Sequence, residues 1–533
     1  MKVVILHMDF NKKNTFITEL PGDQETENIP RQVDEACYSF VKPTKTESPE
    51  LIHYSKEVAE FLGLSESDCQ SEWFLKIFTG NEIIENSKPY AMCYGGHQFG
   101  NWAGQLGDGR AINLAEVEFN GKRWTVQLKG AGATPYSRSA DGLAVLRSSI
   151  REHLCSEAMF HLGVPTTRSL SLSLTGTKVL RDVLYNGNPE YEKGAVVCRV
   201  APSFIRFGSF EIFASKRDNV NLKKLADYTL KHFYPELEQG TKKGYIALFK
   251  AISERTLEMV IHWQRVGFVH GVMNTDNMSI LGLTIDYGPY GWLEGYDKKW
   301  TPNTTDIQHK RYQYGQQGDV ALWNLLKLAN SLFPLVEDAE PLEEIITTYQ
   351  KMYSIRYLEM MKSKLGLELA DEKDLKLIEQ LELNLRLTET DMTIFFRGLA
   401  NLSKKLVLPE KDDLSFLDSV KNAFYKIEEV KGEILGFWKD WIGQYVTRLQ
   451  KEELSDIERK QKMNLVNPKY VLRNYMAQIA IEAADEGDYT VIDELYCLLK
   501  KPYDEQIDQE KWFAKRPEWA RTKVGCSMLS CSS

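Results

Sequence analysis

Apolar and polar residues alternate along two short segments in the first half of the chain. Residues 124–129 (Trp-Thr-Val-Gln-Leu-Lys) carry an apolar side chain at every second position, which is the pattern of a half-buried strand. Residues 196–200 (Val-Val-Cys-Arg-Val) predict a second strand. Between them, residues 145–163 have the spacing of an amphipathic helix that ends at Gly163, with Pro165 just beyond. The pattern predicts a small β-rich unit with one helix inside it.

Helical spacing dominates the rest of the chain. Residues 252–266 have one apolar face and stop at a glycine. From residue 340 to about 500, Leu, Glu and Lys recur at helical spacing, and the charge runs there favour solvated helix faces. Two short strands are expected at residues 278–281 and 283–285, turning at Gly282.

The first 88 residues are polar and irregular, apart from a short helical pattern at residues 57–64. A β-rich lobe followed by a helical lobe is the layout of a protein-kinase-like bilobal fold of the α+β class. We therefore expect five segments: an N-terminal lead-in (1–88), a nucleotide-binding lobe (89–215), a helical lobe with a metal site (216–335), a helical extension (336–500) and a tail (501–533).

Composition narrows the class of protein. The net charge of −9, from 66 basic and 75 acidic residues, argues against a dedicated nucleic-acid binder. No apolar run approaches the ~20 residues that span a membrane. The apolar segment at the start is too short for a signal peptide, so we expect a cytoplasmic protein.

The chemistry concentrates in residues 270–277 (His-Gly-Val-Met-Asn-Thr-Asp-Asn) and 285–288 (Ile-Asp-Tyr-Gly). In the protein-kinase pattern H-R-D-L-x-x-x-N and D-F-G, the Asn and the later Asp hold Mg²⁺. Here Asn277 and Asp286 take those two places, whereas the catalytic Asp falls on Val272, which cannot accept a proton. Asp276 is the only nearby carboxylate that could replace that base.

Capping and turn formation are the common alternative for such Asp and Asn residues, although the complete register favours a metal site. Glycine-rich turns, as in residues 95–109, are more often hairpins than phosphate cradles. No G-x-x-x-x-G-K-[ST] motif occurs there. Arg110, directly after the last glycine, improves the case for phosphate binding.

Two further pairs are candidates for the nucleotide site. Lys129 ends a predicted strand and Glu152 lies on the predicted helix, in the order of the kinase lysine and its glutamate partner. Arg199 and Arg206 bracket an apolar segment; either they pair with an acid such as Glu211, or both reach a polyphosphate.

Eight cysteines occur without a C-x-x-C pair, so a zinc site is not expected. Cys526 and Cys531 lie in a small, polar C-terminal stretch that we expect to be mobile. They are candidates for redox chemistry, with inert thiols as the open alternative.

Several runs together resemble one known family, selenoprotein O, also known as the YdiU group of pseudokinase-like proteins. The runs are residues 94–100, 104–110, 127–130, 134–138 with 141–142, 199–208, 270–277, 286–289, 323–325 and 530–533. Animal members carry selenocysteine near the C-terminus, and Cys531 occupies that place here.

The resemblance implies a protein adenylyltransferase that moves AMP, rather than phosphate, from ATP to Ser, Thr or Tyr hydroxyls of proteins. It implies Asp276 as the base, with Asn277 and Asp286 on Mg²⁺. UMP transfer from UTP with Mn²⁺ is attributed to bacterial members. The residues that it implies around the nucleotide are Gly107, Gly109, Arg110, Lys129, Asp141, Gly142, Arg199, Arg206 and Asp286.

Two alternatives to AMP transfer stay open at this point. One is a true kinase with an unusual base. The other is a catalytically inactive ATP-binding scaffold, against which the joint presence of Lys129, Glu152, Asp276, Asn277 and Asp286 argues.

Overall fold

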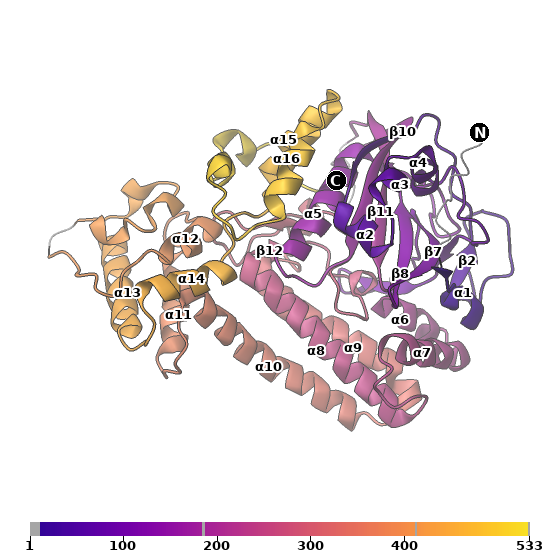
Figure 1. Cartoon of the computed structure of the whole chain (residues 1–533). Coiled ribbons are helices and arrows are strands. Elements are labelled where there is room, and N and C mark those ends of the chain that lie inside the picture. The colour runs from indigo at the N-terminus through magenta and orange to yellow at the C-terminus, as the bar shows by residue number, and fades with distance from the viewer. Residues whose placement is uncertain (1–10, 184–186, 411–412, 531–533) are drawn as a thin grey trace.

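The computed structural model describes residues 11–183, 187–410 and 413–530, and it shows a β-rich lobe followed by helices (Figure 1). This confirms the predicted α+β class with a kinase-like arrangement. In the described ranges, nine antiparallel strands form the main sheet. Its central order is β2 (Tyr38–Phe40), β4 (Tyr90–Met92), β7 (Ala111–Phe119), β8 (Lys122–Lys129), β11 (Glu190–Ala201), β10 (Arg168–Arg181) and β3 (Glu50–Tyr54), while β1 (Asn11–Lys12) pairs with β7 and β9 (Ala144–Val145) with β11.

The alternation along β8 gives the sheet two different faces. Val126 and Leu128 belong to an apolar cluster with residues of α2 (Lys56–Phe61) and α4 (Glu72–Thr79), which follow each other with the short α3 (Glu66–Cys69) between them. Gln127 and Lys129 point to the opposite face, as expected for a period of two. Both predicted strands are confirmed within β8 and β11.

The helix α5 (Leu146–His161) lies on that second face, against β10 and β11. It confirms the helix predicted at residues 145–163. The helical pattern at residues 57–64 is confirmed by α2. The strands β2 and β3, however, come from the first 88 residues and form the two ends of the central sheet. A strand of three or five residues shows too few alternations to be recognised in a polar segment.

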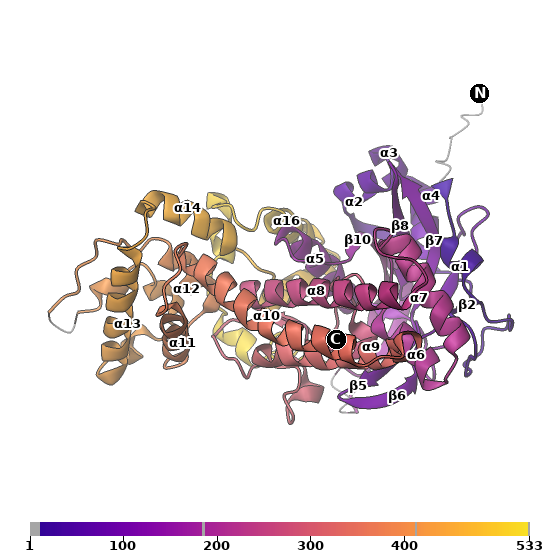
Figure 2. The same ribbon diagram turned by 90° about the horizontal axis from the view of Figure 1, so that it is seen from below.

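The second lobe is helical, and its three long helices run side by side (Figure 2). Among them α8 ends at Gly267, whose φ of 75° provides the left-handed cap that the sequence indicates. A short 3-10 turn, η1 (Thr275–Asn277), carries the metal-motif residues. The helices of this lobe are α6 (Phe207–Ser215), α7 (Asn219–Phe233), α8 (Lys242–Val266), α9 (Gln317–Val336) and α10 (Glu340–Leu365).

The prediction of two paired strands at residues 278–281 and 283–285 is wrong. Gly282 does form the turn, with its N–H donating to Ser279 O at 3.1 Å. Ser279 and Thr284 each make a single bridge to a different segment, at Arg206 and Thr166. Because the two arms find separate partners, no ladder forms between them.

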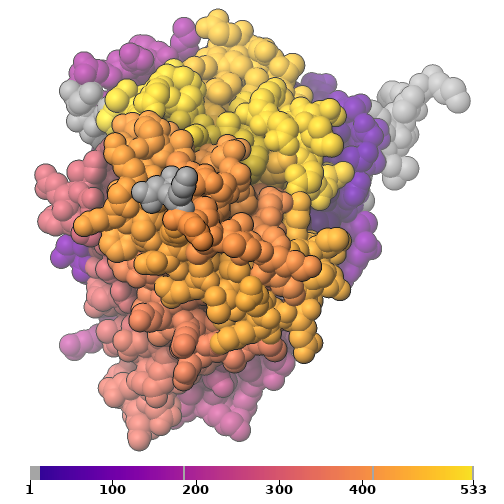
Figure 3. Space-filling model, turned by 90° about the vertical axis from the view of Figure 1, so that its left-hand side faces the viewer, coloured from indigo at the N-terminus to yellow at the C-terminus, as the bar shows by residue number. Residues whose placement is uncertain are grey.

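The helical extension divides into two parts. The helices α11 (Asp374–Asn384), α12 (Met392–Leu399), α13 (Glu433–Leu449) and α14 (Asp456–Val466) form the end of the molecule farthest from the sheet (Figure 1), and with the later C-terminal residues they cover the face shown in Figure 3. The helices α15 (Asn474–Asp485) and α16 (Thr490–Leu499) return to pack on α5. Tyr496 OH donates to Ser55 Oγ at 2.8 Å, so the extension is tied to the β-rich lobe.

The C-terminal stretch is packed as far as it is described. It contains η7 (Ile507–Trp512) and η8 (Glu518–Arg521). The backbone N–H of Thr304 donates to Leu529 O at 2.8 Å, and Cys526 is only 5% exposed. The expectation that Cys526 lies in a mobile tail is therefore wrong, because its side chain belongs to the main core. Cys531 lies outside the described residues.

Among the described residues, no helix is both long enough and apolar enough to cross a membrane.

Candidate active site

A cleft of about 730 Å³ lies between the β-rich lobe and the segment that carries η1. It brings together most of the residues that the sequence nominates for a nucleotide and metal site. Glu152 and Arg206 do not line the cleft; they are buried and contact residues that do. The nominated residues that line it are Gly107, Gly109, Arg110, Lys129, Asp141, Gly142, Arg199, Asp276, Asn277 and Asp286.

Lys129 and Glu152 form a buried ion pair, with 2.6 Å between Nζ and Oε2. The other oxygen of Glu152, Oε1, lies 3.0 Å from Arg199 NH1. Burial lowers the pKa of Lys129, and the Glu152 carboxylate opposes that shift. The register of β8 with β11 pairs Arg199 with Gln127 and so places Lys129 and Arg199 on one face, beside α5.

Asp286 accepts from two arginines, one on each carboxylate oxygen. Arg199 NH1 lies 2.6 Å from Oδ1 and Arg206 NH1 lies 2.5 Å from Oδ2. Burial alone would raise the pKa of Asp286, but these guanidinium groups hold it well below its usual range. The carboxylate is therefore ionised. Its backbone has a φ of 58°, a left-handed conformation that is uncommon outside glycine.

The acid that we considered as a partner for the two arginines, Glu211, is engaged elsewhere. Its Oε2 accepts from Thr275 Oγ1 at 2.8 Å and lies 3.0 Å from His97 Nδ1. Arg199 and Arg206 therefore do form salt bridges, but their shared partner is Asp286 rather than Glu211.

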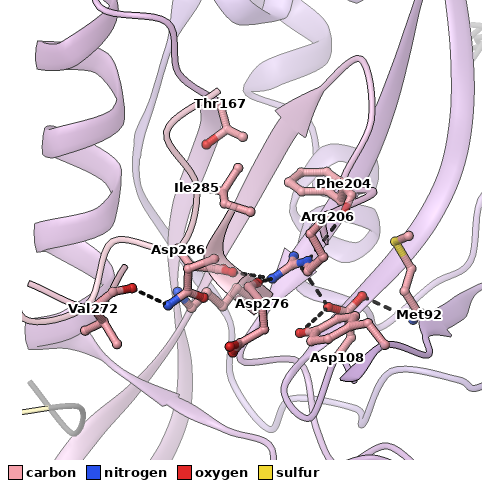
Figure 4. Close-up of polar contacts among 12 residues, drawn as sticks. Met92, Asp108, Thr167, Phe204, Arg206, Val272, Asp276, Ile285 and Asp286 are labelled. Atoms are coloured by element: carbon pink, nitrogen blue, oxygen red, sulfur yellow. Dashed lines mark hydrogen bonds and ion pairs between the residues drawn. The ribbon is translucent and has the colours of Figure 1, made fainter. Parts of the chain in front are cut away.

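Asp276 lies on η1 and is buried at the edge of the cleft. Its Oδ2 accepts from Gln98 Nε2 at 3.1 Å, whereas its buried Oδ1 has no hydrogen-bond partner among the described residues. Burial raises the pKa of Asp276 to about 7, which suits a group that accepts a proton near neutral pH. Arg206 NH1 also donates to Asp276 O at 2.8 Å, so Asp276 and Asp286 share one arginine (Figure 4).

Asn277 is oriented by its own amide. Its Nδ2 donates to Val272 O at 2.8 Å, which leaves Oδ1 as the atom for a ligand. No group of three or more His, Cys, Asp or Glu in the described ranges could hold a metal ion without help. Two oxygen donors, Asn277 and Asp286, nevertheless fit Mg²⁺ or Mn²⁺, since such ions take their remaining ligands from water and substrate phosphates.

The glycine-rich stretch divides into two parts with different surroundings. Gly107 lines the cleft with a φ of 79°, and a Cβ there would lie 2.4 Å from the Tyr136 ring. Gly142 has a φ of 71°, and a Cβ there would lie 2.2 Å from Gly132 O. Gly95 and Gly96, in contrast, belong to the hairpin of β5 (Gly95–Gln98) and β6 (Asn101–Gln105). Within residues 95–109, the first glycines therefore form a hairpin, whereas Gly107 and Gly109 line the cleft.

The remaining charges differ in how they are compensated. Asp141 is bound by both terminal nitrogens of Arg181, each at 2.8 Å. Arg110 makes no ion pair within the part of the chain that the structure describes, although it lines the cleft. An unpaired guanidinium in such a position can bind a phosphate group.

The sequence interpretation missed three residues of this site. Arg181 lines the cleft from β10, Gln98 contacts Asp276, and Asp108 lies 3.8 Å from Arg206 (Figure 4). Asp108 is almost fully buried between two glycines. A carboxylate between two glycines is a sequence feature that could have indicated a site residue at Asp108. No comparable feature of the sequence marks Gln98 or Arg181.

Residues 24–500 match the family described as protein adenylyltransferase SelO. The chain is 62% identical over 520 residues to a protein nucleotidyltransferase YdiU of Flavobacterium johnsoniae, covering 98% of this chain and 99% of that protein. It is 54% identical over 539 residues to the YdiU protein of Rhodopirellula baltica, with the same two coverages. The chain therefore belongs to the SelO/YdiU family of protein nucleotidyltransferases.

Proposed function

We propose that this enzyme transfers AMP from ATP to Ser, Thr or Tyr hydroxyls of proteins and releases pyrophosphate. The observation that carries the proposal is the buried Asp276, whose pKa of about 7 suits a base, beside Asn277 and close to the ionised Asp286. Val272 occupies the place of the usual kinase base, so the proton acceptor has moved within the same loop.

Asp276 takes the proton of the acceptor hydroxyl as its oxygen attacks the α-phosphorus of ATP. The new bond joins that oxygen to the α-phosphorus, and the bond from the α-phosphorus to the bridging oxygen breaks. Pyrophosphate leaves with the electron pair. Arg110 and Lys129 line the cleft and supply positive charge where the leaving group develops its charge.

Asn277 and Asp286 are the proposed ligands of Mg²⁺ or Mn²⁺. When bound, the ion neutralises phosphate charge and orients the α-phosphate. Arg199 and Arg206 fix the Asp286 carboxylate, so its direction is set before nucleotide binding. Since these proposed contacts are to phosphates rather than to a base, UMP transfer from UTP with Mn²⁺ is a second proposed reaction of the same cleft.

The test compares ATP labelled at the α-phosphate with ATP labelled at the γ-phosphate. Protein that acquires the α label, with release of pyrophosphate, supports AMP transfer. Transfer of the γ label alone would contradict it and favour a kinase with an atypical base. Tight Mg-ATP binding with neither label transferred would favour an inactive scaffold.

A further inference from the structure

The β5–β6 hairpin connects the cleft to the surface of the molecule. Its inner residues Gln98 and Phe99 line the cleft, and the backbone N–H of Phe99 donates to Tyr312 OH at 2.9 Å and to Asn274 Oδ1 at 3.3 Å. Its outer strand is exposed at Asn101, Trp102 and Ala103. In Figure 2 the hairpin lies at the lower edge of the molecule, beside α9.

Two cations lie next to the exposed part of this hairpin. A Cβ added at Gly100 would lie 3.6 Å from the Arg311 guanidinium, so Arg311 borders the tip of the hairpin. Arg311 and Lys327 both lie over the Trp323 ring, each 4.5 Å from its centroid. His97 lies 5.4 Å from the Trp323 ring and 5.2 Å from the Trp102 ring, measured between centroids. We call Trp102, Arg311, Trp323 and Lys327 the hairpin surface.

The charge of the hairpin surface is not balanced by ion pairs. Within the described ranges neither Arg311 nor Lys327 forms an ion pair with a carboxylate, and the Nε of Arg311 is buried without a hydrogen-bond partner. The carboxylate of Asp306 is turned inward, where it accepts the backbone N–H groups of Arg311 and Tyr312 at 2.9 and 2.7 Å. Asp319 is exposed on α9, one turn before Trp323. Asp306 and Glu211 attract Arg311 and Lys327 from inside the protein, but among the described residues neither cation has a carboxylate in direct contact.

The hairpin also lies beside the part of the cleft that contains Asp276. Arg110 and Lys129 line the same cleft and lie near enough to each other to interact electrostatically. Asp276 lies where the hairpin meets the cleft, since Gln98 contacts it directly. The hairpin therefore borders one side of the approach to Asp276, which places its exposed strand near an acceptor chain that enters from that side.

We propose that the hairpin surface binds an acidic segment of the acceptor protein, next to the hydroxyl that is modified. The inference rests on the proposed function, because it assigns a substrate class to the same site. Cations held over an indole ring keep a fixed direction, and carboxylates that flank the acceptor residue would pair with them. The exposed Trp102 ring provides apolar contact beside these charges.

The test measures binding of two fluorescein-labelled peptides by anisotropy at low salt in the presence of Mg-ATP. One peptide has a central tyrosine flanked on both sides by aspartates, and the other has the same tyrosine flanked by lysines. The double variant Arg311→Glu/Lys327→Glu reverses the two charges. The matched control, Lys243→Glu/Lys250→Glu, reverses two exposed lysines on α8, whose side chains are 86% and 62% exposed.

The wild-type enzyme and the control should bind the aspartate peptide more tightly than the lysine peptide. The net negative charge of the whole chain would favour the opposite order. The Arg311→Glu/Lys327→Glu variant should weaken that binding about tenfold and prefer the lysine peptide. A gain for one peptide and a loss for the other cannot come from partial unfolding. Equal binding of both peptides by the wild-type enzyme, or equal weakening of both in the variant, would overturn the proposal.

The peptide measurement also separates this inference from the proposed reaction. Binding of the aspartate peptide without transfer of the α label would count against AMP transfer and leave the surface supported. Transfer of the α label to both peptides with equal kcat/KM would count against the surface alone.

Discussion

Gln98 donates from Nε2 to Asp276 Oδ2 at 3.1 Å, across a sequence separation of 178 residues. A carboxylate has no N–H or O–H to offer when it is ionised, so the amide must turn its NH₂ group toward Asp276. On the other side of the carboxylate, a Cβ at Gly96 would lie 3.0 Å from Oδ1. The hairpin thus binds one oxygen of the proposed base through Gln98 and packs closely against the other at Gly96.

The first prediction concerns this contact. Gln98→Met keeps the length of the side chain but removes the donor, so kcat for transfer should fall about tenfold while KM for ATP stays unchanged. Gln98→Glu should lower kcat further, because it brings a like charge against Asp276. Gln105→Met, in the second strand of the hairpin, controls for the loss of an amide there. Steady-state transfer of α label measures all three, and a wild-type kcat in Gln98→Met would contradict the assignment.

The second prediction concerns Asp286. Asp286→Ala and Asp286→Asn should both abolish nucleotide transfer. From the sequence alone we expect the alanine variant to fold normally, but the structure changes that expectation. Alanine removes the carboxylate that Arg199 and Arg206 share and leaves each buried guanidinium with one remaining acid, Glu152 and Asp108 respectively, so it should cost about 3 kcal/mol of stability.

Urea unfolding tests this cost. Asp141→Ala is the matched control, because its carboxylate is 44% exposed and its loss should cost less than about 1 kcal/mol. If the Asp286→Ala variant and the wild-type protein have the same free energy of unfolding, burial of the two arginines does not require the Asp286 carboxylate.

The third prediction separates two buried glutamates of the same helix. Glu152 binds Lys129 and Arg199 at the cleft, whereas Glu157 binds Arg168 away from it. Glu152→Gln should weaken Mg-ATP binding about tenfold or more, because Lys129 loses its orienting partner. Glu157→Gln should lower the melting temperature and leave ATP affinity unchanged. Isothermal titration calorimetry with Mg-ATP distinguishes them, and equal affinities in both variants would remove Glu152 from the nucleotide site.

Local patterns were sufficient to predict part of this architecture. The alternation around Lys129 and the periodicity around Glu152 identify a strand and a helix, and their order suggests the ion pair that the structure shows. The partner of Arg199 could not be found in this way, because Asp286 is distant in sequence and Glu211 was the nearer acid. Gln98 gives no signal either, since only the folded hairpin brings it to Asp276. Long-range contacts of this kind depend on the packing of lobes, which a single sequence does not display.

The C-terminal cysteines show the same limit and lead to the fourth prediction. A small, polar stretch suggested mobile thiols, yet residues 525–530 pack against the rest of the chain, and Asn474 Nδ2 donates to Cys526 O at 2.8 Å. Burial raises the pKa of Cys526 to about 12, so little thiolate exists near neutral pH. Iodoacetamide applied to the native protein should modify the exposed Cys497 and spare Cys526 until urea unfolds the chain. Modification of Cys526 at the same rate as Cys497 in peptide mass spectrometry would contradict the packed position.

The fifth prediction follows from two histidines that join β3, α5 and α16. His53 Nδ1 lies 2.8 Å from His153 Nε2, and the other nitrogen of His153 lies 2.6 Å from Ser169 Oγ. The Tyr496 ring lies 4.3 Å from the His53 ring. Burial lowers the pKa of both histidines to about 3; His153 lowers the pKa of His53 further, whereas Glu157 opposes that shift. Asp493, 3.8 Å from His53 Nε2, is the nearest carboxylate and is largely exposed.

A lowered histidine pKa stabilises the folded state above the unfolded value of about 6.5, and that stability is lost as the pH falls toward 3. Each histidine should contribute a slope of roughly 1.4 kcal/mol per pH unit over this window, because the unfolded chain binds a proton that the folded chain excludes. The melting temperature should therefore fall steeply between pH 6.5 and pH 5, and less steeply in a His53→Gln/His153→Gln variant. His309→Gln, which replaces an exposed histidine, should keep the wild-type slope. Both rings must stay uncharged for α16 to remain packed on α5, so removing them should remove part of the acid sensitivity. If the double variant and the wild-type protein lose stability in parallel as the pH falls, the acid sensitivity arises elsewhere in the protein.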